Sequence, residues 1–162
     1  MAHEKTIGDI TYSVVELPAM RALLIQPLLA PIFVELAGAF AKAVQSVAKA
    51  SGDDDLSMST LLNIDVDAIM PALSRAATKI SPADLEHLTR QLLAGAQMQV
   101  EGKWIPLLGS DGTGGAFDLK MKRRLADVWR LLVFALEVNY PDFFDALGGL
   151  GARLRAASVS AK

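Results

Sequence analysis

Residues 129–138 constrain the fold most, because nearly every position in this stretch is apolar. Together with the residues just before it, the stretch carries apolar side chains at helical spacing: Leu125, Val128, Trp129, Leu132 and Leu136. A helix that is apolar on all sides is buried, either in the core of its own domain or in an interface with another protein. We therefore expect a helical domain organised around this segment, and both kinds of burial stay open.

The chain as a whole is richer in apolar residues than a small domain usually is. Of its 162 residues, 52% are hydrophobic and the mean hydropathy is +0.33, whereas about 45–50% is usual even with glycine included. The longest charge-free run of the first half, residues 22–34, contains two prolines and is shorter than the roughly 20 residues of a membrane span. The N-terminus lacks the apolar core of a secretory leader. We therefore expect a cytosolic protein that offers apolar surface to a protein partner and not to a membrane.

The pattern predicts a mainly α fold, in which a compact helical domain carries one small antiparallel β-sheet made from two short hairpins. A single domain covers residues 1–157, and residues 158–162 form a frayed tail. Residues 1–16 are expected to be extended, with a turn at Gly8-Asp9, and residues 98–107 form the second hairpin around Glu101-Gly102. Because an isolated hairpin is only marginally stable, we expect the two to pair. The remainder of the domain is helical.

Several helices are marked by their own residues. Ser81-Pro82-Ala83-Asp84 is a capping box at a helix start, and Asp118 is expected to cap the long final helix. Proline at 27, 31 and 71 is expected to break or kink the helices that contain it. After Pro31, apolar residues recur at helical spacing: Phe33, Leu36, Ala37, Phe40, Val44 and Val47. A short last helix is expected over residues 142–147.

Sequence motifs for catalysis, cofactors or metals are incomplete. With no cysteine and only His3 and His87, thiol catalysis and multi-histidine metal sites are excluded, and His87 is expected to lie at the surface. The glycine-rich loop 109–115 lacks the lysine of a phosphate loop. Residues 63–67 resemble the start of a calcium loop without its required glycine and glutamate, and Ser46-Val47-Ala48-Lys49 lacks the other motifs of penicillin-recognising enzymes. We expect no catalytic, cofactor or metal residues.

Four cations crowd one short segment, at Lys120, Lys122, Arg123 and Arg124. Cations in the first turns of a helix are unfavourable, so we expect an acidic counterpart, either the loop 53–55 or a partner protein. The chain has a net charge of −2, and the segment lacks interleaved aromatic residues. A nucleic-acid partner is therefore not expected.

Two segments resemble the tail assembly chaperones of long-tailed bacteriophages. The first, residues 12–19, reads Tyr-Ser-Val-Val-Glu-Leu-Pro-Ala and leads into an apolar helix. The second, residues 134–144, ends in Glu-Val-Asn-Tyr-Pro-Asp-Phe-Phe. The resemblance implies a non-enzymatic protein of the host bacterial cytoplasm that binds the tape-measure protein, keeps it soluble, promotes assembly of tail-tube protein and is absent from the virion.

The residues expected to form the partner surface, or a surface for self-association, combine the aromatic ending with parts of the two apolar stripes. They are Phe143, Phe144, Trp129, Leu132, Leu136, Phe33 and Phe40. Two alternatives remain: a tail-completion or other structural protein of the virion, and a small helical ligand-binding domain with a pocket between its helices.

Overall fold

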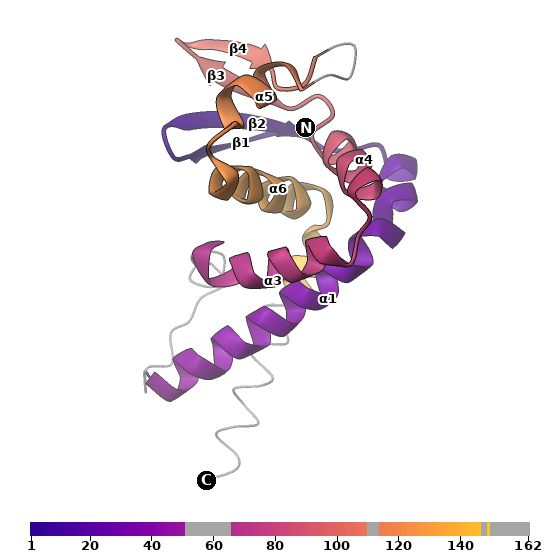
Figure 1. Ribbon diagram of the computed structural model, residues 1–162, viewed down its shortest axis with the longest axis vertical. Coiled ribbons are helices and arrows are strands. Elements are labelled where there is room, and N and C mark those ends of the chain that lie inside the picture. Colours follow the sequence, from indigo (N-terminus) through magenta and orange to yellow (C-terminus); the bar gives the residue numbers. More distant parts are fainter. Residues whose placement is uncertain (51–65, 110–113, 147–148, 150–162) are drawn as a thin grey trace.

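The computed structural model describes residues 1–50, 66–109, 114–146 and 149 (Figure 1). The fold is mainly α with one small four-stranded antiparallel sheet, as the sequence pattern predicts. The acidic loop 53–55, residues 63–65 of the calcium-like motif, the middle of the glycine loop and the tail 158–162 lie outside the described residues. Predictions about their structure stay predictions.

The sheet consists of the two predicted hairpins. β1 (Ala2–Ile7) and β2 (Ile10–Val15) are joined at Gly8-Asp9, where Gly8 has a φ of 63°. β3 (Gln97–Val100) and β4 (Lys103–Pro106) are joined at Glu101-Gly102, both with positive φ, as a tight hairpin turn requires. β2 pairs with β3, which gives the order β1-β2-β3-β4. The expectation that the hairpins pair is confirmed.

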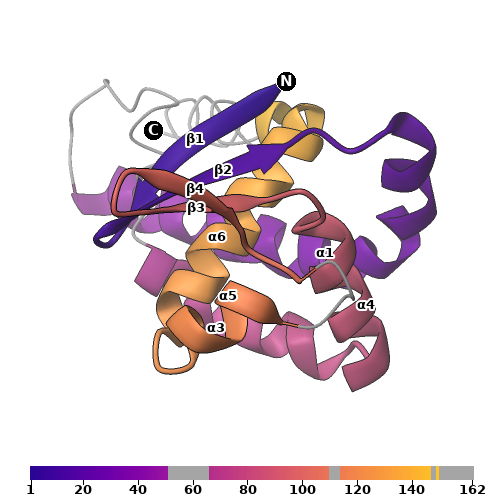
Figure 2. The same cartoon turned by 90° about the horizontal axis from the view of Figure 1, so that it is seen from above.

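The longest helix is α1 (Ala19–Ala50), and it contains Pro27 and Pro31. The expected break does not occur, because the chain stays helical through both prolines. Its first turns lie at an angle to the rest of the helix (Figure 2), which is the bend that a proline causes by removing a backbone donor. Packing of α1 against other helices offsets the free-energy cost of placing two prolines inside a helix.

Two helices follow the undescribed segment. α3 (Val66–Thr78) also continues through its proline, Pro71, which therefore does not interrupt it. α4 (Pro82–Leu92) begins as predicted: the Ser81 hydroxyl accepts a hydrogen bond from the Asp84 amide at 3.1 Å. An ion pair one turn apart also stabilises α4, with Arg90 donating to Glu86 at 2.8 Å. His87 is exposed, as expected.

The last third of the chain corrects one prediction. Asp118 does not cap the long final helix, because it lies inside a separate short helix, α5 (Gly115–Met121), and α6 (Leu125–Asn139) begins after a turn. Lys120 therefore lies in the last turn of a helix, where a cation is favourable. After α6, residues 141–146 form the expected short helix.

The core lies between the sheet and the helices, with α6 in the middle (Figures 1 and 2). β1 and β2 contact one side of α6, and α3, α4 and α5 contact the others. Six consecutive residues of α6, 131–136, are buried. Of the two kinds of burial that the sequence left open for this segment, the structure shows the first: residues 131–136 lie in the core of the domain itself.

Candidate protein-binding surface

The helix α1 is apolar on two opposite faces. One face carries Ile25, Leu29, Ile32 and Leu36, which are at most 5% exposed and pack in the core. Their spacing of three and four residues keeps them on one side of a helix. This face attaches α1 to α3 and α4.

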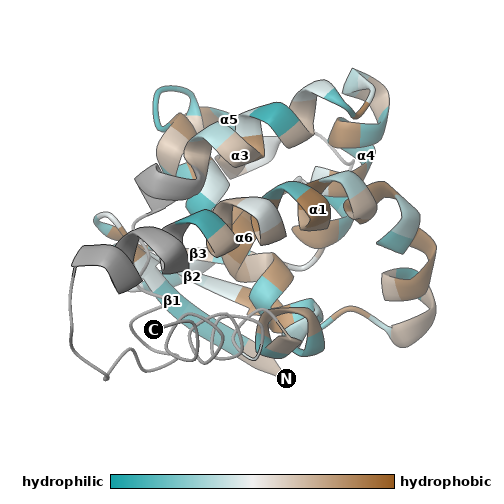
Figure 3. Cartoon of the chain, turned by 90° about the horizontal axis from the view of Figure 1, so that it is seen from below, coloured by the Kyte–Doolittle hydropathy of each residue, from teal (hydrophilic) through white to brown (hydrophobic). Residues whose placement is uncertain are grey.

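The opposite face of α1 is exposed, and we call it the outer stripe. It consists of Met20, Leu23, Leu24, Pro27, Ala30 and Val34. The four large residues among them are 60–70% exposed, although each is apolar. Hydrophobic colour continues onto the outer side of the first turns of α1 (Figure 3). The outer stripe has the i, i+3, i+4, i+7 spacing by which one helix is recognised by another.

By length and composition alone, Ala19–Lys42 could cross a membrane. Its mean hydropathy is 1.8, and 22% of its most apolar window is buried. The sequence argument that the segment is too short does not hold for the helix as a whole, because α1 continues through both prolines. The same residues nevertheless belong to the folded domain through their buried face.

The border of the outer stripe is fixed by an ion-paired carboxylate. Glu35 accepts hydrogen bonds from Lys79 Nζ at 2.6 Å and from Arg75 Nε at 3.1 Å, which joins α1 to the end of α3. These two bonds, led by that from Lys79, lower the pKa of Glu35 below its ordinary value. The charge of Glu35 is thereby compensated within the domain.

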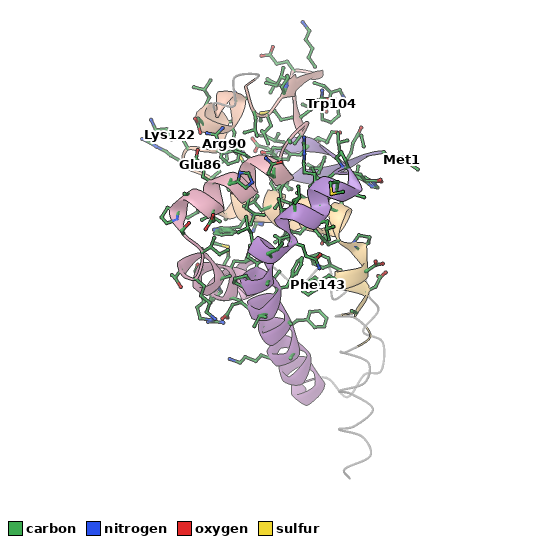
Figure 4. The ribbon with its side chains drawn as sticks, turned by 90° about the vertical axis from the view of Figure 1, so that its right-hand side faces the viewer. Met1, Glu86, Arg90, Trp104, Lys122 and Phe143 are labelled. Carbon is green, nitrogen blue, oxygen red and sulfur yellow. The ribbon has the colours of Figure 1, made fainter. Side chains whose placement is uncertain are left out.

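Three of the predicted partner residues come together beside α1. Phe143 stacks on Phe33 with ring centroids 4.0 Å apart, and Phe144 meets the edge of Phe143 at 5.3 Å. All three are half-buried. Phe143 lies against the ribbon of α1 (Figure 4). This aromatic cluster attaches the short helix 141–146 to the flank of α1 and keeps part of its surface accessible.

The other predicted partner residues do not join this cluster. Leu132 and Leu136 are 8% and 2% exposed and lie in the core. Trp129 is half-buried and lines a small apolar cavity with them. Phe40 is half-buried two helical turns beyond Phe33 on α1.

The sequence analysis missed Met20, Leu23 and Leu24 as surface residues. A signal was present, since residues 22–34 carry no charge and lie in an apolar helix. This helix has more apolar side chains than one buried face can hold, which indicates a second apolar face that is exposed.

Three residues at the end of α6 make contacts with α1, the residues before it and β1. Asn139 Oδ1 accepts a hydrogen bond from the Leu17 amide at 2.6 Å, and the Tyr140 hydroxyl donates to the Ala22 carbonyl at 2.7 Å. Burial raises the pKa of that hydroxyl. Glu137 accepts from Lys5 at 3.0 Å. The bonds of Asn139 and Tyr140 fix the position of the first turns of α1, which carry half of the outer stripe, and that of Glu137 joins α6 to β1.

The described residues offer little for chemistry on a small molecule. Within them, no group of three or more histidine, aspartate or glutamate side chains is placed to hold a metal ion. The apolar cavity between α1, α3, α4 and α6 has a volume of about 10 Å³, which is the size of one water. A larger open groove of about 590 Å³ runs past His3, Glu16 and Asn139, and these three polar side chains are already hydrogen-bonded within the protein.

A closed helical core with an exposed apolar stripe is typical of proteins that bind other proteins. Residues 8–151, nearly the whole chain, match the model of a family described as phage tail assembly chaperone protein, TAC. The chain belongs to this family, and the resemblance seen in its sequence is confirmed. No curated protein and no solved structure matches it.

Proposed function

We propose that this tail assembly chaperone binds the tape-measure protein through the outer stripe of α1. Binding keeps that long helical protein soluble in the host cytoplasm until tail-tube protein assembles around it, and it requires no catalysis. The observation that carries the proposal is the exposure of Met20, Leu23, Leu24 and Val34 on one face of a helix whose other face is already buried.

The energetics favour a helical client. Burying a large apolar side chain contributes about 1.5–3 kcal/mol, so three or four side chains supply several kcal/mol against the cost of association. The stripe is continuous along the helix axis, and its spacing matches ridges of a second helix packed alongside. The aromatic cluster of Phe33, Phe143 and Phe144 adds half-buried rings at one flank of α1.

Co-expression of the full chain with the tape-measure protein tests the proposal. The variant Leu23→Ser/Leu24→Ser removes two exposed leucines, so the fold is retained, as circular dichroism checks. We expect at least a tenfold loss of co-purified and soluble tape-measure protein. The matched control is Leu119→Ser/Leu125→Ser, which removes two equally exposed leucines elsewhere and is expected to keep the client.

Three outcomes contradict the proposal. If the outer-stripe variant and its control retain or lose the tape-measure protein equally, the outer stripe is not the binding surface. Flotation of the wild-type protein with lipid vesicles, abolished by Leu23→Ser/Leu24→Ser, assigns the stripe to a membrane. A dimer in sedimentation that the same variant dissociates, with no loss of client, assigns it to self-association.

The alternative of a virion protein is tested by mass spectrometry of purified particles. A chaperone that leaves before the tail is complete is missing from them, so stoichiometric presence of this chain in the virion contradicts the proposed role. The alternative of a ligand-binding domain has little support, since the described cavity between the helices holds about one water.

A further inference from the structure

Residues 119–125, which comprise the end of α5, the turn after it and the first residue of α6, present leucines and cations together; we call this segment the basic elbow. Leu119 is 81% and Leu125 66% exposed, and the intervening Lys120, Lys122 and Arg123 are exposed as well. The Lys122 side chain extends away from the ribbon, on a different side from Phe143 (Figure 4). Two apolar side chains thus bracket a positively charged turn.

The basic elbow is held in place from inside by its two remaining residues. Met121 is buried, and its sulfur accepts a hydrogen bond from the Tyr12 hydroxyl at 3.3 Å. Arg124 Nη2 donates to Asp9 Oδ2 at 3.2 Å, at the β1–β2 turn, and Arg124 Nη1 lies 3.9 Å from Asp127. The outward groups are therefore presented by an anchored turn, which lowers the entropy lost when a partner binds.

Most of the charge on the basic elbow is not compensated within the described part of the chain. Arg124 pairs with Asp9, and that hydrogen bond lowers the pKa of the Asp9 carboxyl. Lys122 and Arg123 form no ion pair with any described residue. Asp118 is the only carboxylate in the helix before the turn, so residues 118–125 remain net positive. Clustered cations favour an approaching negative charge.

We propose that the basic elbow is a second docking surface, and that its partner is an acidic protein segment with leucine-like side chains among its carboxylates. Charge complementarity selects the acidic segment and sets its orientation, and Leu119 and Leu125 select apolar side chains within it. A nucleic acid would pair with the cations through its phosphates but would leave Leu119 and Leu125 without an apolar partner. Its bases stack on aromatic side chains, and the basic elbow has none.

The basic elbow and the first turns of α1 lie on opposite sides of the molecule (Figures 2 and 3). A partner on one surface therefore leaves the other open. The inference does not rest on the proposed binding of tape-measure protein, and a chaperone with two surfaces can hold two tail components at once.

A synthetic peptide of about four helical turns, with leucines at i, i+3, i+4, i+7 spacing and glutamate elsewhere, is the probe. Its affinity for the full chain is measured by fluorescence anisotropy. We expect Lys122→Glu and Arg123→Glu each to weaken binding about tenfold, and Leu119→Ser/Leu125→Ser to weaken it by a similar factor. The matched charge control is Lys103→Glu on β4, and the apolar control is Val15→Ser on β2, at an exposed residue outside both surfaces; both are expected to bind normally.

Several results overturn the inference. Unchanged affinity in all elbow variants shows that the peptide binds elsewhere, and loss in the Leu23→Ser/Leu24→Ser variant assigns it to the outer stripe instead. If polyglutamate binds as tightly as the leucine-containing peptide, the leucines contribute nothing. If a short DNA duplex displaces the peptide at equal concentration and elbow variants lose the duplex, the surface is a nucleic-acid site.

Discussion

Two helices of this protein, α1 and α6, are rich in apolar residues on all sides, and the fold treats them differently. α6 is surrounded by the sheet and by α3, α4 and α5, and residues 131–136 are all buried. α1 contacts mainly α3 and α4, and its outer stripe stays exposed. The two helices differ in burial because α6 has more neighbouring elements than α1, although both are rich in apolar residues.

The comparison shows how surplus apolar surface acquires a function. An apolar helix in the centre of a domain stabilises the fold, whereas one at its edge stabilises the fold with one face and is available to a client with the other. The following variants test how sharply the two helices differ, in order of decreasing expected effect.

The largest effect is expected at the centre of α6. Leu131 is fully buried, so Leu131→Ala leaves a cavity and lowers the free energy of unfolding by about 2–5 kcal/mol. Urea denaturation measures the change. The control is Leu125→Ala at the exposed start of the same helix, with an expected change within about 0.5 kcal/mol. Equal effects of the two substitutions would show that α6 is not enclosed.

An intermediate effect is expected where α6 is connected to the start of α1. Asn139→Ala removes the acceptor for the half-buried Leu17 amide and the donor to the Ala135 carbonyl. Leaving a backbone group unpaired costs about 1–3 kcal/mol, measured by the same denaturation. Asp142→Ala, at an exposed position nearby, is the control. A loss no larger than that of the control contradicts this role for Asn139.

A smaller, pH-dependent effect is expected at the border between the two faces of α1. The bonds from Lys79 and Arg75 lower the pKa of Glu35 from its ordinary 4.5, so their stabilisation is present above that pH and is lost as pH falls through the lowered value. Glu35→Gln should therefore reduce the melting temperature at pH 7 and make little difference at pH 2. A pH-independent difference contradicts the ion-pair origin.

The smallest effect on stability is expected on the outer stripe. Leu24 is 70% exposed, and Leu24→Ser should change the free energy of unfolding by less than about 0.5 kcal/mol while weakening client binding. Thermal denaturation and co-purification measure the two quantities separately. Ile25→Ser, at the neighbouring buried position, is expected to destabilise strongly. A strong destabilisation by Leu24→Ser would place that side chain in the core.

The elements that the sequence predicts well are those fixed by local chemistry. The cap at Ser81 and the tight turns at Gly8-Asp9 and Glu101-Gly102 each depend on a few neighbouring residues. Of the break or kink expected at the prolines, α1 shows the bend and no break, and α3 continues through Pro71, because tertiary packing outweighs a local helix cost of a few kcal/mol. The Asp118 cap was wrong because the turn after Met121 has no strong local signal.

The candidate surface was predictable only in part. Phe33, Phe143 and Phe144 were identified from the sequence, and the structure brings them together; Leu132 and Leu136 were placed in the same set, and the structure buries them. Which face of an apolar helix is covered depends on elements far away in the sequence. The charge-free run 22–34 indicates a second apolar face on the helix, but which residues stay exposed, Met20, Leu23 and Leu24 among them, follows from the fold.

The two prolines in α1 also change what a client meets there. Position 27 has no N–H for the Leu23 carbonyl, and position 31 has none for the Pro27 carbonyl. Two backbone oxygens beside the leucines consequently keep spare hydrogen-bonding capacity. If a client helix binds the outer stripe as proposed, an asparagine, glutamine or lysine among its apolar residues would find acceptors in these two carbonyls, and their fixed positions would favour one register along α1.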